Sequence, residues 1–407
     1  MEITMKINYR STLAACYLGY ITQAITINLI PLFFVIFGER YGVSYTQLGG
    51  LVLLTFVIQI AVDAAMIKLT YVIGYRISAV AAHVLSAAGL AMLGILPNFI
   101  APYAAILISV SVYAIGGGMT EVVISPIVES LPGDAKASSM SLLHSFYSWG
   151  LVAVVSITTV LLRIVGDDLW YVIPIVWAAV PFFNIFFFSK VPLVPITKEA
   201  EAVPFRAYFK SPVMYVAIVL MICGGASEMA MSQWASLFAE SGLGVTKVLG
   251  DLLGPCLFAI FMGLGRTVYG MFGSKINIKK ALLSCAVLTV FCYLLTVFAD
   301  APLLSLAGCA LCGFGVSLMW PGVLSMTSAE FGTASGPALF AFLALAGDVG
   351  CSLGPWITGK VSDLYLAISS SVSGSDALRA GLLAATLFPV IMIFGCTVML
   401  LTGKRKK

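Results

Sequence analysis

The chain has 407 residues, of which 60% are hydrophobic and only 10% are charged, with a formal net charge of +4. Soluble domains carry roughly 25% charged residues, so this composition, with a mean hydropathy of +1.05, excludes a soluble globule. The apolar runs continue for about 20 residues, the length that a helix needs to cross a bilayer, whereas barrel strands would alternate. We therefore predict an all-α polytopic membrane protein.

Hydropathy predicts twelve spans with short connections, except at residues 190–211, which are Pro-rich and charged and lie near the middle of the chain. We predict a six-helix bundle over 1–189, a cytoplasmic linker over 190–211 and a second six-helix bundle over 212–407. The predicted spans cover about 11–37, 46–73, 77–96, 101–130, 138–164, 168–189, 212–239, 247–273, 279–299, 302–329, 335–360 and 379–402.

The distribution of Lys and Arg predicts the orientation. With the N-terminus in the cytoplasm, fifteen of these residues fall on the cytoplasmic side and five on the outer side, as the positive-inside rule expects. We expect both termini in the cytoplasm, a location in the bacterial cytoplasmic membrane and no nucleic-acid partner. The first apolar run is too long for a signal peptide and lacks a convincing cleavage site, so we expect it to remain as the first span.

Most of the nine cysteines fall inside predicted spans. Cys309 and Cys312 have two residues between them, but these residues lie on an apolar helix without His or acidic partners. We interpret all nine as small apolar packing residues, and we expect neither a metal site nor a cofactor.

An internal repeat relates the two halves. The segment GVSYTQLGGLVLL from Gly42 resembles GVTKVLGDLLGP from Gly244, and each begins the second span of its half. The glycines at 116–118 in the fourth span likewise recur at Gly313 and Gly315 in the tenth. Paired halves are typical of secondary transporters, whose solute site lies near mid-bilayer between them. The chain has no Walker-type phosphate loop, so we do not expect ATP-driven pumping.

The fourth and fifth spans carry ionisable residues where hydrocarbon is expected. A charge at the middle of a span costs at least ~2.5–3.5 kcal/mol, and such residues usually face a water-filled cavity. Glu121 and Ser125 are one turn apart, and His144 and Tyr147 share a face of the next helix. These groups can hold a polyol and exchange a proton. The alternative is that Glu121 and His144 only tie two helices together.

The first two spans add polar groups. Gln23, Thr26 and Asn28 precede Pro31, which frees a backbone carbonyl and allows a bend. We place Asn28 and Gln59 in the predicted solute site. Interhelical hydrogen bonding is the alternative.

The second half supplies Glu228, Gln233 and Trp234 on the seventh span and Trp320 on the tenth. An aromatic ring can cover the apolar side of a sugar, whereas the alternative for each Trp is an interfacial anchor. We therefore add these four residues to the solute site. The predicted proton-coupling residues are Glu121, His144 and Glu228.

Four further charges are predicted to act in gating. Asp63 lies inside the second span, and we favour a gate-region charge over solute contact. Arg266 and Asp348 are opposite charges that are costly alone and tolerated as a pair. We predict that they pair directly or through Glu330 as a cytoplasmic latch, with a purely structural pair as the alternative.

The run GGGMTEVVISPIVESLP followed by LLHSFYSWG resembles the fourth and fifth helices of the bacterial fucose:proton symporter family, within the major facilitator superfamily. The runs KLTYVIG from Lys68 and GDVGCSLGP from Gly347 are also similar. The resemblance implies a twelve-helix transporter that imports a monosaccharide or similar polyol with protons, with Glu121 as the fourth-helix acid of binding and coupling. The family's first-helix acid is replaced here by Thr26, Ile27 and Asn28. Coupling would then rest on Glu121, His144 or Glu228.

We therefore expect a transporter, not an enzyme, that works as a monomer by alternating access and binds a small hydrophilic solute and protons. An exporter of drugs or amphipathic metabolites is the first alternative, since the many Phe and Met residues permit a larger apolar site. A membrane sensor or lipid-handling protein without transport is the second, although nothing beyond the membrane core resembles a signalling domain.

Overall fold

The computed structural model describes residues 9–131, 136–194, 205–272, 276–331, 337–368 and 373–404. Every regular element in these ranges is a helix, which confirms the predicted fold class. Eleven helical stretches in the described ranges are long and apolar enough to cross a membrane. The predicted span that is not among them is the eleventh, 335–360, which corresponds to α14 (Pro337–Ile368), a helix of 32 residues that carries Asp348, Lys360 and Asp363.

The chain divides into two compact units. Unit 1 comprises Met1–Ile30 and Ile58–Lys198, and unit 2 comprises Pro31–Val57 and Glu199–Lys407. The end of the first predicted span and the start of the second thus group with unit 2. Part of the predicted linker, 195–204, lies outside the described residues.

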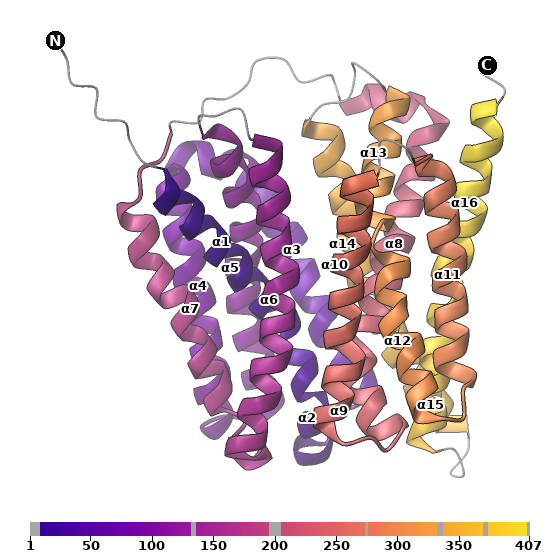
Figure 1. Cartoon of the computed structure of the whole chain (residues 1–407). Helices are drawn as coiled ribbons and strands as arrows, with labels where there is room; N and C mark the ends of the chain where they lie inside the picture. Colours follow the sequence, from indigo (N-terminus) through magenta and orange to yellow (C-terminus); the bar gives the residue numbers. More distant parts are fainter. Residues whose placement is uncertain are drawn as a thin grey trace. The chain divides into compact units, whose positions relative to one another are not determined.

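Unit 1 is a bundle whose helices run side by side, drawn from indigo to magenta in Figure 1. The helix α4 packs along both α5 and α7, and α1 packs on α5 and α6. Its helices are α1 (Arg10–Asn28), the part of α3 (Tyr45–Ile73) from Ile58 onward, α4 (Tyr75–Ile95), α5 (Pro102–Ser130), α6 (Lys136–Val165) and α7 (Val172–Lys190).

Arg76 ties α4 to the end of α7. Its guanidinium donates to the backbone carbonyls of Phe188, Ser189 and Val191 at 2.8–2.9 Å. The last carbonyls of a helix have no partner within the helix, and a cation there is favoured by the helix dipole. Arg76 therefore caps α7.

Unit 2 is organised around the packing of α8 on α14. Glycines make this approach possible, because a Cβ on Gly350 would lie 1.9 Å from the carbonyl oxygen of Ile222 and one on Gly354 2.6 Å from that of Ala226. Its helices are α2 (Phe34–Tyr41), the start of α3, α8 (Pro212–Leu237), the π-helical turn η5 (Phe238–Gly242), α9 (Lys247–Asp251), the π-helical turn η6 (Leu252–Cys256), α10 (Leu257–Phe272), α11 (Ile278–Phe298), α12 (Pro302–Val316), α13 (Met319–Phe331), α14, α15 (Gly374–Ala385) and α16 (Leu387–Lys404).

The first predicted span is interrupted at Pro31. A 3-10 turn covers Ile30–Phe33 between α1 and α2, so the bend that proline was expected to allow is present. The tenth predicted span is likewise divided between α12 and α13, just before Trp320.

The internal repeat has a backbone counterpart. Gly42 and Gly244 have φ values of 63° and 64°, a left-handed conformation that favours glycine. Each follows one predicted span and leads into the next. The two halves therefore use the same turn at equivalent positions.

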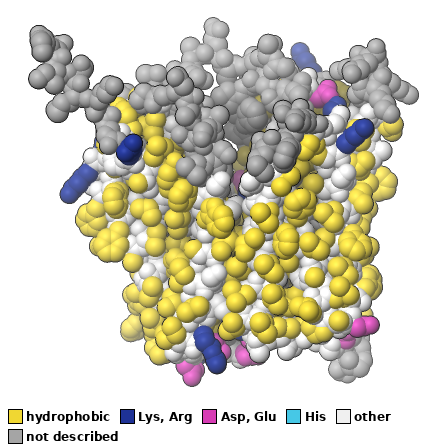
Figure 2. All heavy atoms as spheres, viewed as in Figure 1, with side chains coloured by type: hydrophobic (Ala, Val, Ile, Leu, Met, Phe, Trp, Pro, Cys, Tyr) yellow, Lys and Arg dark blue, Asp and Glu magenta, His cyan; other side chains and the backbone are white. Residues whose placement is uncertain are grey.

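The surface of both units suits a lipid environment. Figure 2 shows hydrophobic side chains over the middle of the visible face, with charged side chains near its upper and lower edges. Large apolar residues such as Phe99, Phe183 and Phe298 are more than half exposed. All nine cysteines are free and buried, which confirms their interpretation as packing residues.

A matched pair of glycines tests the packing of α12 on α10. A Cβ on Gly313 would lie 2.0 Å from the carbonyl oxygen of Phe258, whereas a Cβ on Gly263 would have open space within 4 Å. Gly313→Ala should lower the free energy of unfolding by about 1–3 kcal/mol through overpacking. Gly263→Ala should be neutral or stabilise by up to ~1 kcal/mol. Thermal unfolding in detergent would measure both, and equal melting temperatures would contradict the described packing.

Candidate functional site

Three consecutive glycines position the polar groups of unit 1, because each faces a different neighbouring helix. A Cβ on Gly116 would lie 2.6 Å from the carbonyl oxygen of Ala82 on α4, one on Gly117 3.0 Å from Thr26 Oγ1 on α1, and one on Gly118 3.2 Å from the Cα of Gln59 on α3. Helix α5 therefore approaches all three helices closely, and the next turn places Glu121 among them.

Glu121 accepts hydrogen bonds from two buried amides. Gln23 Nε2 donates to Glu121 Oε2 at 2.7 Å, and Gln59 Nε2 donates to the same oxygen. Gln23 and Gln59 are only 5% and 2% exposed. The structure thus brings together two of the predicted solute-site residues, Gln59 and Glu121. It also adds Gln23, which the prediction had treated as one polar residue of the first span.

Two further contacts extend this cluster. Tyr20 and Ser125 share a hydrogen bond between their hydroxyl groups at 2.7 Å, and Asn28 Nδ2 donates to the hydroxyl of Tyr147 at 3.3 Å. Three predicted site residues, Asn28, Ser125 and Tyr147, therefore lie in polar contacts between helices of unit 1. His144 lies on α6, but its side chain is outside the described part of the structure.

Asp63 lies one turn beyond Gln59 on α3, on the face that α5 approaches. Its Oδ1 atom is buried without a hydrogen-bond partner, and its carboxylate interacts electrostatically with Glu121. No Lys or Arg in the described part of the chain forms an ion pair with either acid. The described contacts of Asp63 therefore include no basic partner.

In unit 2 the buried acid Glu228 lies against a base. Glu228, which is 7% exposed, lies 3.9 Å from the NH2 nitrogen of Arg266, and Arg266 Nε donates to the carbonyl of Ser317 at 3.4 Å. The predicted pairing of Arg266 with Asp348 is therefore wrong. Gly265 explains the difference, because a Cβ there would lie 2.2 Å from Ser317 Oγ. The close approach carries Arg266 toward Ser317 and within reach of Glu228 on α8.

The predicted link through Glu330 is also wrong. Glu330 forms an ion pair with Lys279 at the start of α11, and Lys279 also donates to the carbonyl of Met399 at 3.3 Å. Asp348 is buried on α14, one residue after Gly347, where a Cβ would lie 2.4 Å from the ring of Trp320. The half-buried Trp320 ring therefore packs against α14 beside Asp348.

Trp234 is enclosed by its own chain. Its ring is 0% exposed, its Nε1 donates to the carbonyl of Pro355 at 3.0 Å, and the rings of Phe34 and Tyr45 have centroids 5.5 and 6.0 Å from it. In this structure the ring has no surface open to a solute, which contradicts the predicted role. Its neighbour Gln233 is 1% exposed and donates to Met229 Sδ at 3.7 Å.

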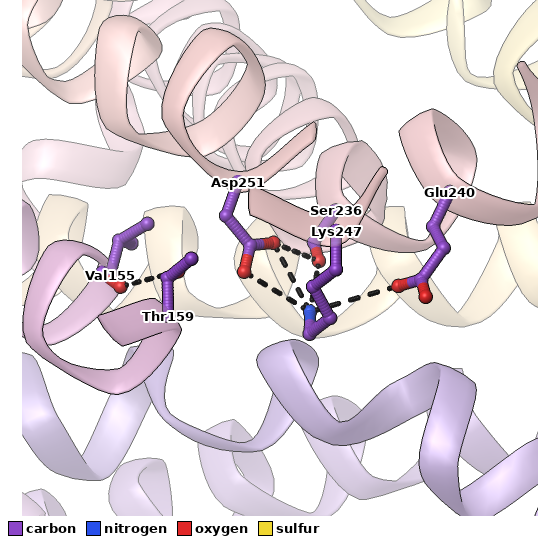
Figure 3. A network of polar contacts seen from close by, with 6 residues as sticks. All are labelled: Val155, Thr159, Ser236, Glu240, Lys247 and Asp251. Atoms are coloured by element: carbon purple, nitrogen blue, oxygen red, sulfur yellow. Dashed lines mark hydrogen bonds and ion pairs between the residues drawn. The ribbon is translucent and has the colours of Figure 1, made fainter. Parts of the chain in front are cut away.

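A third network surrounds Lys247 (Figure 3). Its ammonium donates to Ser236 Oγ at 3.1 Å and Asp251 Oδ1 at 3.2 Å, and Ser236 donates to Asp251 Oδ1. Glu240 lies 3.9 Å away. The network joins α8 to α9 between the two π-helical turns. A buried carboxylate with a cation and a hydroxyl donor is well compensated, so this network is a structural tie.

Comparison with known proteins decides the family. A sequence profile described as Major Facilitator Superfamily matches residues 16–355. The chain belongs to the Major Facilitator Superfamily. Its members are transporters, so the chain is not an enzyme but an integral membrane secondary transporter. No curated protein sequence matches the chain.

Solved structures of other transporters share the fold. The chain is similar to a D-xylose-proton symporter with a TM-score of 0.78, 15% identity and 96% of each chain covered. It is similar to the nucleoside transporter NupG with a TM-score of 0.72, 15% identity and coverage of 96% and 98%. A variant of the E. coli fucose:proton symporter FucP gives a TM-score of 0.63, 15% identity and coverage of 96% and 99%. At these identities the likeness shows the fold alone.

Sequence reasoning missed one contact of this transporter, at the start of α3. Asp363 on α14 accepts hydrogen bonds from the backbone N–H groups of Tyr45 at 3.2 Å and Thr46 at 2.7 Å. A carboxylate at a helix N-terminus satisfies orphan donors and is favoured by the dipole. Gly49 and Gly359 permit the approach, because a Cβ would lie 2.7 Å from the Pro355 carbonyl and 2.3 Å from the Tyr45 carbonyl, respectively.

Removing this cap should destabilise unit 2. Asp363→Ala leaves two N–H groups without their acceptor and should lower the free energy of unfolding by about 0.5–2 kcal/mol. Asp363→Asn keeps one acceptor and should lose less. Melting temperatures of the purified variants in detergent would measure the order wild type, Asn variant, Ala variant, and an Ala variant as stable as wild type would contradict the cap.

Proposed function

We propose that this protein imports a small hydrophilic solute, with a monosaccharide as the leading candidate, in symport with protons. The observation that carries the proposal is the pairing of Glu121 with the buried amides of Gln23 and Gln59. Ionisable groups within a membrane span are costly, and those that occur usually line a substrate or proton path. Unit 1 holds a carboxylate, amides and hydroxyls on adjacent helices, and these are the groups that bind hydroxyl-rich molecules.

The cluster matches polyols better than amphipathic cations. Amide and hydroxyl groups each donate and accept hydrogen bonds, so Gln23, Gln59 and Asn28 can exchange their present partners for solute hydroxyls. The aromatic rings of Tyr17 and Phe146 stack on each other with their centroids 4.4 Å apart, so the stacked faces are not open to a solute. Among the predicted second-half residues, the half-buried Trp320 remains the candidate for an aromatic face.

The names of similar structures support the same solute class. Those proteins are named as transporters of D-xylose, fucose and nucleosides, and each of these solutes carries several hydroxyl groups. The resemblance to the fucose:proton symporter family in the fourth and fifth helices points the same way. We retain the predicted orientation, with both termini in the bacterial cytoplasm and 190–211 as a cytoplasmic linker between two six-helix halves.

Glu121 is our proposed proton-coupling residue. The first helix has no acid near Asn28, and Glu228 is compensated by Arg266, which makes Glu228 a weaker candidate than the sequence suggested. A carboxyl group that is reached by solute hydroxyls and by protons can link the two movements. His144 stays in the proposal on its sequence position alone.

Uptake into proteoliposomes tests this function. Wild type should accumulate at least one member of a panel of pentoses, hexoses and nucleosides when an inward proton gradient is imposed. Glu121→Gln removes the proton carrier but keeps the amide contacts, so accumulation should fall to the equilibrium level while exchange of labelled solute continues. Full accumulation by this variant would place the coupling group elsewhere.

A matched control is available on the protein surface. Glu39 on α2 is exposed, and Glu39→Gln should transport like wild type. Failure of wild type to move any hydroxylated solute, together with binding of hydrophobic cations, would favour the exporter instead.

A further inference from the structure

We infer that Arg266 binds a carboxylate of the transported solute, so that the solute is an acidic monosaccharide of the uronic-acid type. The inference rests on the proposed function and deepens it, because it names the chemical class of the hydroxylated solute. It also gives Arg266 a role in solute binding in place of the predicted cytoplasmic latch.

The first argument is the interruption of the tenth span. Helices α12 and α13 are separated by a turn at Ser317 and Leu318. In a continuous helix the carbonyl of Ser317 would accept a hydrogen bond from the N–H group four residues later, but that residue is Pro321, which has no N–H. Substrate sites of secondary transporters are typically formed by discontinuous helices with freed backbone groups. The break therefore marks a place in unit 2 where a ligand is expected.

The second argument is the orientation of the Arg266 guanidinium. Its Nε donates to the freed carbonyl of Ser317 at 3.4 Å, and its Nη2 lies 3.9 Å from Glu228 Oε2. These contacts are on the edge of the guanidinium that Nε and Nη2 form. The other edge, formed by Nη1 and Nη2, makes no hydrogen bond with any residue that the structure describes. A rigid pair of N–H donors is therefore left for a planar acceptor.

The third argument is the exposure of this side chain. Arg266 is 30% exposed, although it lies within a candidate membrane span, Lys247–Tyr269. Charged residues within spans usually face the bundle interior or a water-filled cavity. Lys247, Lys279 and Arg379, by contrast, are engaged by acids or by helix-end carbonyls. Arg266 is therefore the base of unit 2 whose contacts leave it available to a solute.

The charge of the site fits one carboxylate. A guanidinium binds a carboxylate through two parallel N–H groups, which gives both strength and orientation. Glu228 already offsets the positive charge from beyond hydrogen-bonding distance, so a carboxylate suits the site better than a phosphate monoester, which carries a charge of roughly −2. The charge of the carboxylate is offset by the proton that the proposed function moves with the solute. The half-buried Trp320, three residues after Ser317, is the candidate for covering the sugar ring.

Titration calorimetry on the purified full-length protein in detergent tests the site. At constant pH and ionic strength, D-glucuronate would be compared with D-glucose and D-galacturonate with D-galactose, since each acid differs from its partner only in the carboxylate. Wild type should bind at least one acid about tenfold more tightly than its neutral partner, because a hydrogen-bonded charge pair is stronger than a neutral hydrogen bond. D-glucose 6-phosphate tests the kind of anion and should bind less tightly than the acid.

Variants complete the test. Arg266→Gln should abolish the preference for the acid and change the affinity for the neutral sugar little, and Arg266→Lys, which keeps the charge without the fork, should keep only part of the preference. Arg266→Gln leaves Glu228 without its base, so the double variant with Glu228→Gln removes both charges and should lose the preference equally. Lys280→Gln, at an exposed position on α11, should bind like wild type. Retained melting temperatures would establish that the variants are folded.

Three results would overturn the inference. The first is wild type that binds no acid more tightly than its neutral partner. The second is a full preference for the acid in folded Arg266→Gln or in the double variant. The third is tighter binding of D-glucose 6-phosphate than of either acid, which would assign a phosphate site instead.

Binding and uptake together separate this inference from the proposed function. If wild type binds an acid through Arg266 but accumulates no hydroxylated solute in a proton gradient, the carboxylate site stands and the proposed function fails. If wild type accumulates a neutral sugar with protons and shows no preference for the acids, the proposed function stands and the carboxylate site fails.

Discussion

The close approach of α5 to three neighbouring helices determines where the polar groups of unit 1 lie. Each of the glycines 116–118 removes a Cβ that would collide with, or press tightly against, a different helix. In a membrane, helices associate through packing at small residues and through interhelical hydrogen bonds, without a hydrophobic driving force between them. The glycines and the Gln23–Glu121–Gln59 contacts are therefore parts of one interface.

The two units compensate the acids of their polar clusters differently. Unit 2 opposes the buried Glu228 with Arg266 and the buried Asp251 with Lys247. Glu121 in unit 1 is held by neutral amides instead. A Lys or Arg side chain neutralises its carboxylate permanently. A neutral amide does not, so the carboxylate can still gain or lose a proton. The difference explains why we look to unit 1 for the coupling chemistry, although the halves share a repeat.

Features set by local chemistry could be predicted from the sequence. Hydropathy gave the helices, Pro31 marked the interruption, and Gly42 and Gly244 marked equivalent left-handed turns. The candidate site was predicted by residue type, because Gln59 and Glu121 are polar groups at membrane depth. Pairing was harder. Whether Arg266 meets Glu228 or Asp348 depends on how closely α10 and α12 pack at Gly265, and that distance is not encoded in either residue. The capping role of Asp363 was not predicted, because the prediction considered only charges in the middle of the spans and Asp363 lies near a helix end.

Arg266 has a consequence for how the protein is made. An arginine within a membrane span raises the free energy of entering the bilayer, by roughly 2.5–3.5 kcal/mol at the centre of the span and by less toward its ends. Helix α8, which carries Glu228, is synthesised before α10. The carboxylate of Glu228 is therefore available to pair with Arg266 when α10 is made. The salt bridge in the finished fold would thus also assist biogenesis, because the two helices can enter the lipid as a pair rather than one at a time.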